Sequence, residues 1–253
     1  MIQNSSPTVL DQSRLVSLLT ELSPVKLNSK DDNLAERLGQ LIGLSGSISL
    51  AQALRQRPQS LRLSDDAQIV TLQEPVLRAR KKMIQRVRDS FDHQPGDLQN
   101  KVPTANVAIR AAALLTYAPY HRFYTTFQVE LSAEVQKLRL MVRQNLMNVS
   151  AQLTQLAELD HTLEASLAVH NRKLFSVTPK LLEQRFKLLL KQHQENDLDS
   201  NENEPEQWLS PGAWLDIFYQ DMRELLLAEF DVRLQPVFGL LEALNEHTKK
   251  HNE

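Results

Sequence analysis

Residues 138–174 read LRLMVRQNLMNVSAQLTQLAELDHTLEASLAVHNRKL, and their apolar positions recur at the period of an α-helix. The seam passes through Leu138, Val142, Leu146, Val149, Leu153, Leu156, Asp160, Leu163, Leu167, His170 and Leu174. Its ten steps cover 36 residues, which gives a mean step of 3.6. A coiled coil holds a repeat of about 3.5 residues and supercoils, whereas the longer period fits a nearly straight helix along one wall of a globular bundle.

The distribution of glycine predicts the same class of fold. Between Gly96 and Gly212 the chain has 115 residues without a glycine. We therefore predict an all-α protein with a small N-terminal three-helix unit and a larger antiparallel bundle of long helices. The expected organisation is an N-terminal helical unit over residues 1–60, a connection with a basic amphipathic helix over residues 61–102, and a helical bundle over residues 103–248 that contains an acidic linker at residues 195–207.

Prolines set the expected boundaries of the long helices, because a proline is tolerated in the first turn of a helix and breaks or kinks its interior. Pro119 is expected to begin the helix that contains the seam, and Pro179 to break it. Pro236 and Gly239 are expected to kink the chain before a last short helix at residues 240–244.

The chain lacks the signatures of common enzyme classes. It has no cysteine, which excludes disulfides, thiolate zinc sites and cysteine nucleophiles. The P-loop, the dinucleotide-binding glycine pattern, the nucleophile elbow and the His-Glu-x-x-His motif are also missing. We therefore expect a non-enzymatic protein with no catalytic residue and no cofactor. The first residues do not read as a secretory signal and no apolar run is long enough to span a bilayer, so a cytoplasmic location is expected.

Charge is segregated along the chain, although the formal net charge is only −2. Basic side chains crowd the amphipathic helix predicted at residues 76–91, and acidic side chains crowd the linker. The predicted apolar side of the basic helix comprises Leu77, Ile84, Val87 and Phe91. The candidate partner-binding residues on its other side are Arg78, Lys81, Lys82, Arg86 and Arg88.

Two functions fit a helix of this kind. In the first, the protein is an adaptor that docks helices against a protein partner, with the basic helix facing an acidic surface. In the second, it is a nucleic-acid-binding accessory protein in which the basic helix 76–91 follows a phosphate backbone. A third reading makes the charge run a solvated helix face that the acidic linker neutralises within the same chain.

Five aromatic side chains fall within residues 117–127. Such rings could stack on bases or anchor a partner. The spacing of Tyr120, Phe123, Tyr124 and Phe127 places these four on one face of a helix, which favours a core at one end of the bundle.

A metal-binding helical bundle is a further alternative. Glu158 and His161 match the Glu-x-x-His spacing of metal sites in helical bundles. A di-iron site needs that motif twice, and the chain has one copy. We interpret Asp160, His161 and Glu164 more simply as a polar interruption of the seam and assign no metal ligand.

Four segments of the chain match a known pattern in order. They are AERLGQLIGLSGSISLAQAL from Ala35, YAPYHRFY from Tyr117, LLEQRF from Leu181 and LLLAEFDVRLQPVFGLLEAL from Leu225. Over nearly its whole length the chain resembles a proteobacterial family of helical proteins classed as a domain of unknown function. The resemblance implies a gene neighbourhood with stator-type proton-channel-like and outer-membrane-protein-A-like envelope proteins. It therefore implies, by association, a cytoplasmic accessory subunit of an envelope-associated membrane assembly, and it implies no catalytic residue.

Overall fold

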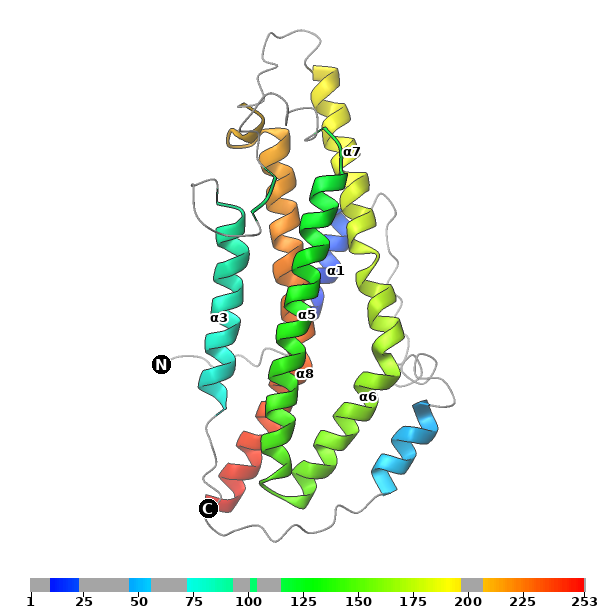
Figure 1. Cartoon of the computed structure of the whole chain (residues 1–253), viewed down its shortest axis with the longest axis vertical. Helices are drawn as coiled ribbons and strands as arrows, with labels where there is room; N and C mark the ends of the chain where they lie inside the picture. The colour runs from blue at the N-terminus through cyan, green and yellow to red at the C-terminus, as the bar shows by residue number, and fades with distance from the viewer. Residues whose placement is uncertain are drawn as a thin grey trace. The chain divides into compact units, whose positions relative to one another are not determined.

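The computed structural model describes residues 10–22, 46–55, 72–92, 101–103, 115–196 and 207–252 (Figure 1). Every regular element in these ranges is a helix, which confirms the predicted all-α class. The elements are α1 (Leu10–Leu22), α3 (Gln73–Ser90), α5 (Ala118–Met147), α6 (Ala151–Phe175), α7 (Thr178–Asn196), the short 3₁₀ helix η2 (Gln207–Leu209) and α8 (Trp214–Asn252). Residues 46–55 are helical as well.

The chain divides into two compact units, each built from three separate stretches. The first comprises residues 1–26, 80–132 and 175–232, and the second comprises residues 27–79, 133–174 and 233–253. Helices α3, α5 and α8 contribute residues to both units, and the last residue of α6, Phe175, belongs to the first. Most of the predicted N-terminal unit at residues 1–60 lies outside the described residues, so that unit stays a prediction. Of its described helices, α1 contacts α7 in the first unit and residues 46–55 belong to the second.

Aromatic side chains form the core of the first unit. Tyr120, Tyr124 and Phe127 of α5 are fully buried, and Phe123 is 7% exposed, which confirms the predicted aromatic core. The ring of Tyr120 meets Phe218 of α8 edge to face with centroids 5.4 Å apart. Each edge-to-face pair adds about 0.5–1.5 kcal/mol beyond the burial of its apolar area. The centroid of the Tyr120 ring also lies 5.3 Å from that of Phe186 on α7, so the aromatic stretch after Pro119 fixes the position of α5 against α7 and α8.

The second unit contains an antiparallel hairpin in place of the single seam helix that the sequence predicts. Helix α5 ends at Met147, a turn occupies residues 148–150, and α6 runs back along α5 from Ala151. The side-chain hydroxyl of Ser150 accepts a hydrogen bond from the backbone N–H of Leu153 at 3.2 Å, so Ser150 caps the new helix. The prediction of one helix was wrong because the break uses a serine cap and needs neither glycine nor proline.

The prolines have different effects. Pro119 lies in the first turn of α5 and Pro179 in the first turn of α7, after a two-residue break at 176–177, as predicted. The separate helix at residues 240–244 was a wrong prediction, because α8 continues through Pro236 to Asn252. A proline removes one backbone hydrogen bond. The buried side chains of Leu234 and Val237 on either side keep this part of α8 packed.

Candidate functional site

Helix α3 carries the candidate partner-binding residues, and its buried face differs in part from the predicted one. Val87 is fully buried and Phe91 is 6% exposed, as predicted, whereas Leu77 is 41% exposed. Val76 and Met83 are buried instead. The helix begins at Gln73, three residues before the predicted start. Its buried stripe therefore follows positions 76, 83 and 87, which share one side of an α-helix, and position 77 falls outside it.

Two arginines fasten α3 to other helices of the first unit. Arg80 donates two hydrogen bonds to one carboxylate oxygen of Asp231 on α8, at 2.7 and 3.2 Å. Arg86 donates from Nε to the Glu130 carboxylate of α5 at 2.9 Å. The hydrogen bond to Glu130 raises the pKa of Arg86, so this guanidinium stays charged. Of the candidate residues, Arg86 is thus engaged within the chain.

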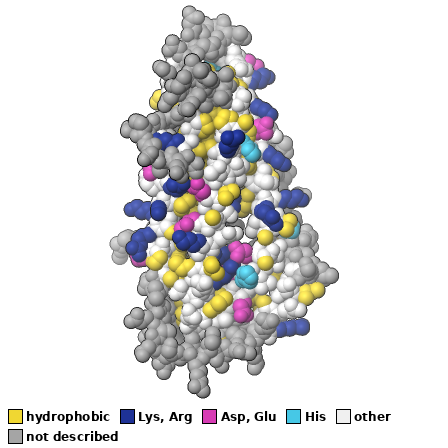
Figure 2. Space-filling model, in the orientation of Figure 1, with side chains coloured by type: hydrophobic (Ala, Val, Ile, Leu, Met, Phe, Trp, Pro, Cys, Tyr) yellow, Lys and Arg dark blue, Asp and Glu magenta, His cyan; other side chains and the backbone are white. Residues whose placement is uncertain are grey.

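The other four candidate residues, Arg78, Lys81, Lys82 and Arg88, are exposed. No described residue forms an ion pair or a side-chain hydrogen bond with them. Lys81, Lys82 and Arg88 belong to the first unit, and we call these three the basic face of α3. Figure 2 shows Lys and Arg side chains over α3, with Asp and Glu side chains among them. The acidic linker lies almost wholly outside the described residues, at 197–206.

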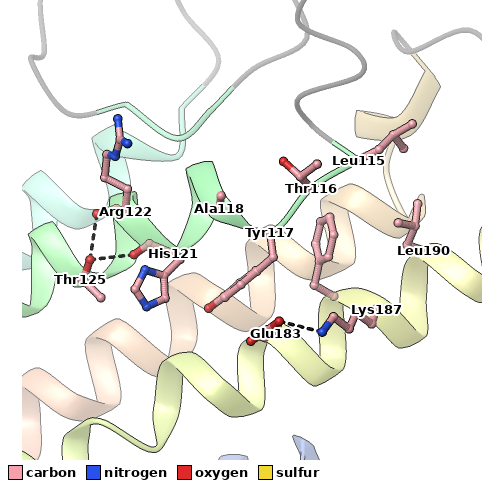
Figure 3. A pocket seen from close by; sticks show the side chains of 11 residues that line it. Leu115, Thr116, Tyr117, Ala118, His121, Arg122, Thr125, Glu183, Lys187 and Leu190 are labelled. Atoms are coloured by element: carbon pink, nitrogen blue, oxygen red, sulfur yellow. Dashed lines mark hydrogen bonds and ion pairs between the residues drawn. The ribbon is translucent and has the colours of Figure 1, made fainter.

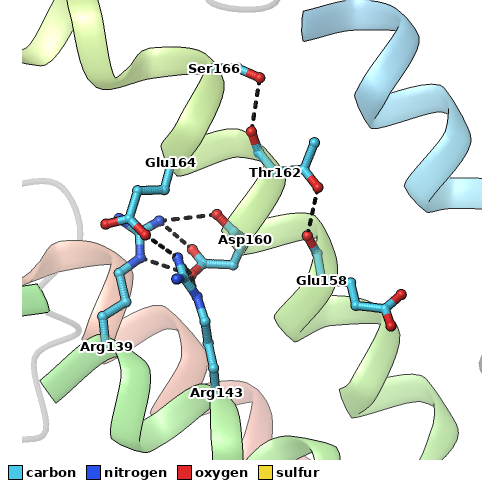
Figure 4. A network of polar contacts seen from close by, with 7 residues as sticks. All are labelled: Arg139, Arg143, Glu158, Asp160, Thr162, Glu164 and Ser166. Carbon is cyan, nitrogen blue, oxygen red and sulfur yellow. Dashed lines mark hydrogen bonds and ion pairs between the residues drawn. The ribbon is translucent and has the colours of Figure 1, made fainter. Parts of the chain in front are cut away.

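A four-residue ion network joins the two helices of the hairpin (Figure 4). Asp160 of α6 accepts hydrogen bonds from the guanidinium groups of Arg139 and Arg143 of α5, at 2.5–2.8 Å. Arg143 also reaches Glu164 at 2.7 Å. The side chains of Arg139 and Arg143 are only 10% and 7% exposed. Sequence reasoning missed these arginines. The i, i+4 spacing of Arg139 and Arg143 beside the seam, and the same spacing of Asp160 and Glu164, were a usable signal.

A buried carboxylate in the first unit was also missed. Glu229 of α8 is fully buried. Its carboxylate accepts a hydrogen bond from the Tyr124 hydroxyl at 2.9 Å and from the Gln128 amide at 2.9 and 3.0 Å. These donors replace the water that an ionised carboxylate would otherwise need. In the sequence Glu229 lies inside an apolar stretch with no feature that marks its partners.

Glu158 and His161 line one cavity of about 500 Å³ in the second unit. Residues 46–55, α5 and α6 supply its walls. Among the described residues, no group of three or more His, Asp or Glu side chains is arranged to hold a metal ion. The pair therefore lacks the additional protein ligands of a metal centre in a helical bundle.

A second cavity, of about 790 Å³, lies in the first unit beside the start of α5 (Figure 3). Tyr117 lines it and donates a hydrogen bond to the backbone carbonyl of Pro179 at 2.6 Å. Burial, and then the nearby charge of Glu183, raise the pKa of Tyr117. Lys187 in the same wall pairs with Glu183 at 2.7 Å, so its charge is already balanced.

None of the described helices is long and apolar enough to cross a membrane. No curated protein and no solved structure matches the chain. The model of one protein family, described as proteins of unknown function (DUF3348), matches residues 1–246. Because the match covers almost the whole sequence, this chain belongs to the DUF3348 family of proteins of unknown function.

Proposed function

We propose that the protein is a cytoplasmic, non-enzymatic adaptor that binds an acidic segment of a partner protein through the basic face of α3. One observation carries the proposal. Lys81, Lys82 and Arg88 are exposed and unpaired among the described residues, while their neighbours Arg80 and Arg86 are paired with carboxylates of α8 and α5. The same helix thus uses two arginines for its own anchoring and leaves these three cations, together with Arg78, exposed to solvent.

A fixed helix is a favourable place for such charges. Binding costs less conformational entropy when the contacting surface is already ordered. The backbone of α3 is held by buried Met83 and Val87 and by the two arginine pairs, so only side-chain rotamers need to be ordered. Charged rim contacts of this kind mainly raise the association rate and fix specificity. The expected complex is therefore sensitive to ionic strength.

The identity of the partner follows from the family resemblance alone. The resemblance implies an association with stator-type channel proteins, and we therefore propose the cytoplasmic part of such a membrane protein as the first candidate. On this proposal the chain is an accessory subunit of an envelope-associated assembly. The acidic partner segment would lie along α3 opposite Lys81 and Lys82.

Nucleic acid is the second candidate, because exposed lysines and arginines on one helix face also suit a phosphate backbone. The overall composition argues against it, since nucleic-acid-binding domains are usually basic and this chain has a formal net charge of −2. The two candidates differ in what nuclease treatment does to the complex.

The test is affinity purification of the tagged protein from its native host at near-physiological salt, with and without nuclease. The Lys81→Glu/Lys82→Glu variant is compared with Lys249→Glu/Lys250→Glu, which makes the same charge change at two exposed lysines of α8. We expect one protein partner to survive nuclease, to be lost from the α3 variant and to be retained by the α8 control. Equal recovery with both variants would contradict the proposal. Loss of every partner on nuclease treatment would favour nucleic acid.

A further inference from the structure

We infer that the cavity bounded by residues 46–55, α5 and α6 is a binding site for a small primary amine, whose ammonium group pairs with the carboxylate of Glu158. This site is separate from the basic face of α3, and the inference does not rest on the proposed function. All of its walls belong to the second unit.

Each of the three helices presents one face to the cavity. Helix 46–55 contributes Ser49, Gln52 and Ala53, α5 contributes Leu140, Arg143, Gln144 and Met147, and α6 contributes Glu158, His161 and Thr162. These positions are spaced i, i+3, i+4 on every helix, so each set shares one side of its helix. The amide of Gln155 on α6 donates to the backbone carbonyl of Leu54 at 2.9 Å and joins helix 46–55 to α6. The cavity is therefore built from regular secondary structure.

The charge available to a ligand in this cavity is negative. Among the described residues that line the cavity, Arg143 is the only lysine or arginine. Its guanidinium is only 7% exposed and bonds to both Asp160 and Glu164. Glu158, by contrast, has no ion pair and no side-chain hydrogen bond with any described residue. In Figure 4 its carboxylate points away from the two arginines.

The remaining wall fits a short aliphatic amine. Gln52, Gln144 and His161 also lack side-chain hydrogen-bond partners among the described residues, and their oxygen and nitrogen atoms can accept bonds from an ammonium group. Leu140, Met147 and Ala53 supply an apolar surface, and Leu140 is 54% exposed. An ammonium group beside Glu158 with a hydrocarbon chain over Leu140 would satisfy both parts of the wall.

The probe is n-hexylamine. The comparison compounds have similar chains: n-hexanol is uncharged and hexanoate is negatively charged. Binding is followed in the full chain by the NMR signals of the Met147 methyl group. We expect saturable binding of hexylamine with a Kd of about 1 mM, in the range for a ligand of about seven non-hydrogen atoms. Hexanol and hexanoate should bind at least about tenfold more weakly, because a charge-assisted pair is lost.

Two variants locate the ammonium group. Glu158→Gln should weaken hexylamine binding about tenfold or more, and Glu246→Gln, at an exposed glutamate of α8, should leave the affinity unchanged. Both variants should keep the thermal midpoint of the wild type. No saturable binding of hexylamine up to ~10 mM, equal affinity of Glu158→Gln, or tighter binding of hexanoate would each overturn the assignment.

An ammonium group can also come from a lysine side chain of a polypeptide. Nα-acetyl-lysine amide presents the same amine on a peptide-like unit. Tighter binding of hexylamine than of this compound supports a free amine as the ligand. Binding of the lysine compound at least about tenfold tighter would overturn the free-amine assignment and make the cavity a lysine-recognition site.

Discussion

Asp160 occupies a position of the apolar seam, and its partners Arg139 and Arg143 lie 21 and 17 residues earlier in the sequence. In the hairpin, each guanidinium reaches the Asp160 carboxylate with at least one hydrogen bond. A residue that interrupts an apolar pattern in the sequence thus becomes the centre of a compensated charge cluster. The interruption itself was visible in the sequence, whereas its partners depended on the turn at residues 148–150.

Removing the carboxylate of Asp160 should destabilise the protein strongly. In Asp160→Ala, two guanidinium groups that are 7–10% exposed would share Glu164 alone. Breaking a buried pair by removing one partner costs about 3–5 kcal/mol. The matched control is Glu183→Ala, which breaks the exposed Lys187–Glu183 pair and should cost less than about 1 kcal/mol. Urea denaturation measures both free energies of unfolding, and equal values for the two variants would refute the expectation.

The hydrogen bond between Tyr124 and the buried Glu229 allows a second test at this scale. Tyr124→Phe keeps the ring in the core but removes the hydroxyl that donates to the Glu229 carboxylate at 2.9 Å. Leaving a buried acceptor short of a donor costs about 1–3 kcal/mol. We expect a loss of that size in urea denaturation. A variant as stable as the wild type would mean that this hydroxyl contributes nothing to the stability of the core.

At the scale of the element, the turn between α5 and α6 depends on Ser150. Replacing Ser150 by alanine removes the cap on the Leu153 N–H and should cost about 1 kcal/mol. Ser150→Asp should keep most of the stability, because aspartate is also a favoured cap. Ser166→Ala is the control. Among the described residues the Ser166 hydroxyl bonds only to a carbonyl within α6, so its loss should be nearly neutral. Thermal denaturation of the three variants would separate these cases.

Helix boundaries were predictable where proline marks them and less so elsewhere. Pro119 and Pro179 mark the starts of α5 and α7, because each proline lies in the first turn of its helix. The seam kept its 3.6-residue period across the turn after Met147, so periodicity alone could not show that the chain reverses there. In α8 the prediction from proline was wrong: the helix was expected to break at Pro236, but it continues, because buried residues on either side keep it packed.

At the scale of the whole molecule, the buried tyrosines give the stability a dependence on alkaline pH. Burial raises the pKa of Tyr117, Tyr120 and Tyr219 above the ordinary value of about 10. Above that pH the unfolded chain releases protons that the folded chain keeps, so stability falls as pH rises. Each such tyrosine contributes a slope of about 1.4 kcal/mol per pH unit.

The thermal midpoint should therefore decrease as the pH is raised from 9 to 11. The decrease should be smaller in Tyr120→Phe. The hydroxyl of Tyr219 also donates to the backbone carbonyl of Pro103. Tyr120→Phe leaves this hydrogen bond in place, although it removes the hydrogen bond between the side chains of Tyr120 and Tyr219. If the thermal midpoint of Tyr120→Phe decreased with pH as steeply as that of the wild type, the pKa of Tyr120 would not be higher in the folded state than in the unfolded state.

The class of fold and the aromatic core of the first unit followed from the sequence, because helical periodicity and the spacing of large rings are local properties. The candidate site followed in part. Exposure of Lys81, Lys82 and Arg88 agrees with the amphipathic pattern, but the pairing of Arg86 with Glu130 joins residues 44 positions apart. The cavity that we assign to an amine required three helices to meet. Only its Glu158 and His161 were singled out beforehand, for a different chemistry.

Position-specific photo-crosslinking in the native host tests the proposed role of α3 most directly. In the first variant a photoreactive amino acid replaces Gln85, an exposed residue that lies one turn from Lys81 and from Arg88. In the control variant it replaces Gln136, an exposed residue of α5. We predict that position 85 crosslinks to one acidic protein partner, that Lys81→Glu/Lys82→Glu abolishes this product, and that position 136 does not give it. The same product from both positions, or a product that survives the charge reversal, would contradict the assignment of α3 as the partner-binding surface.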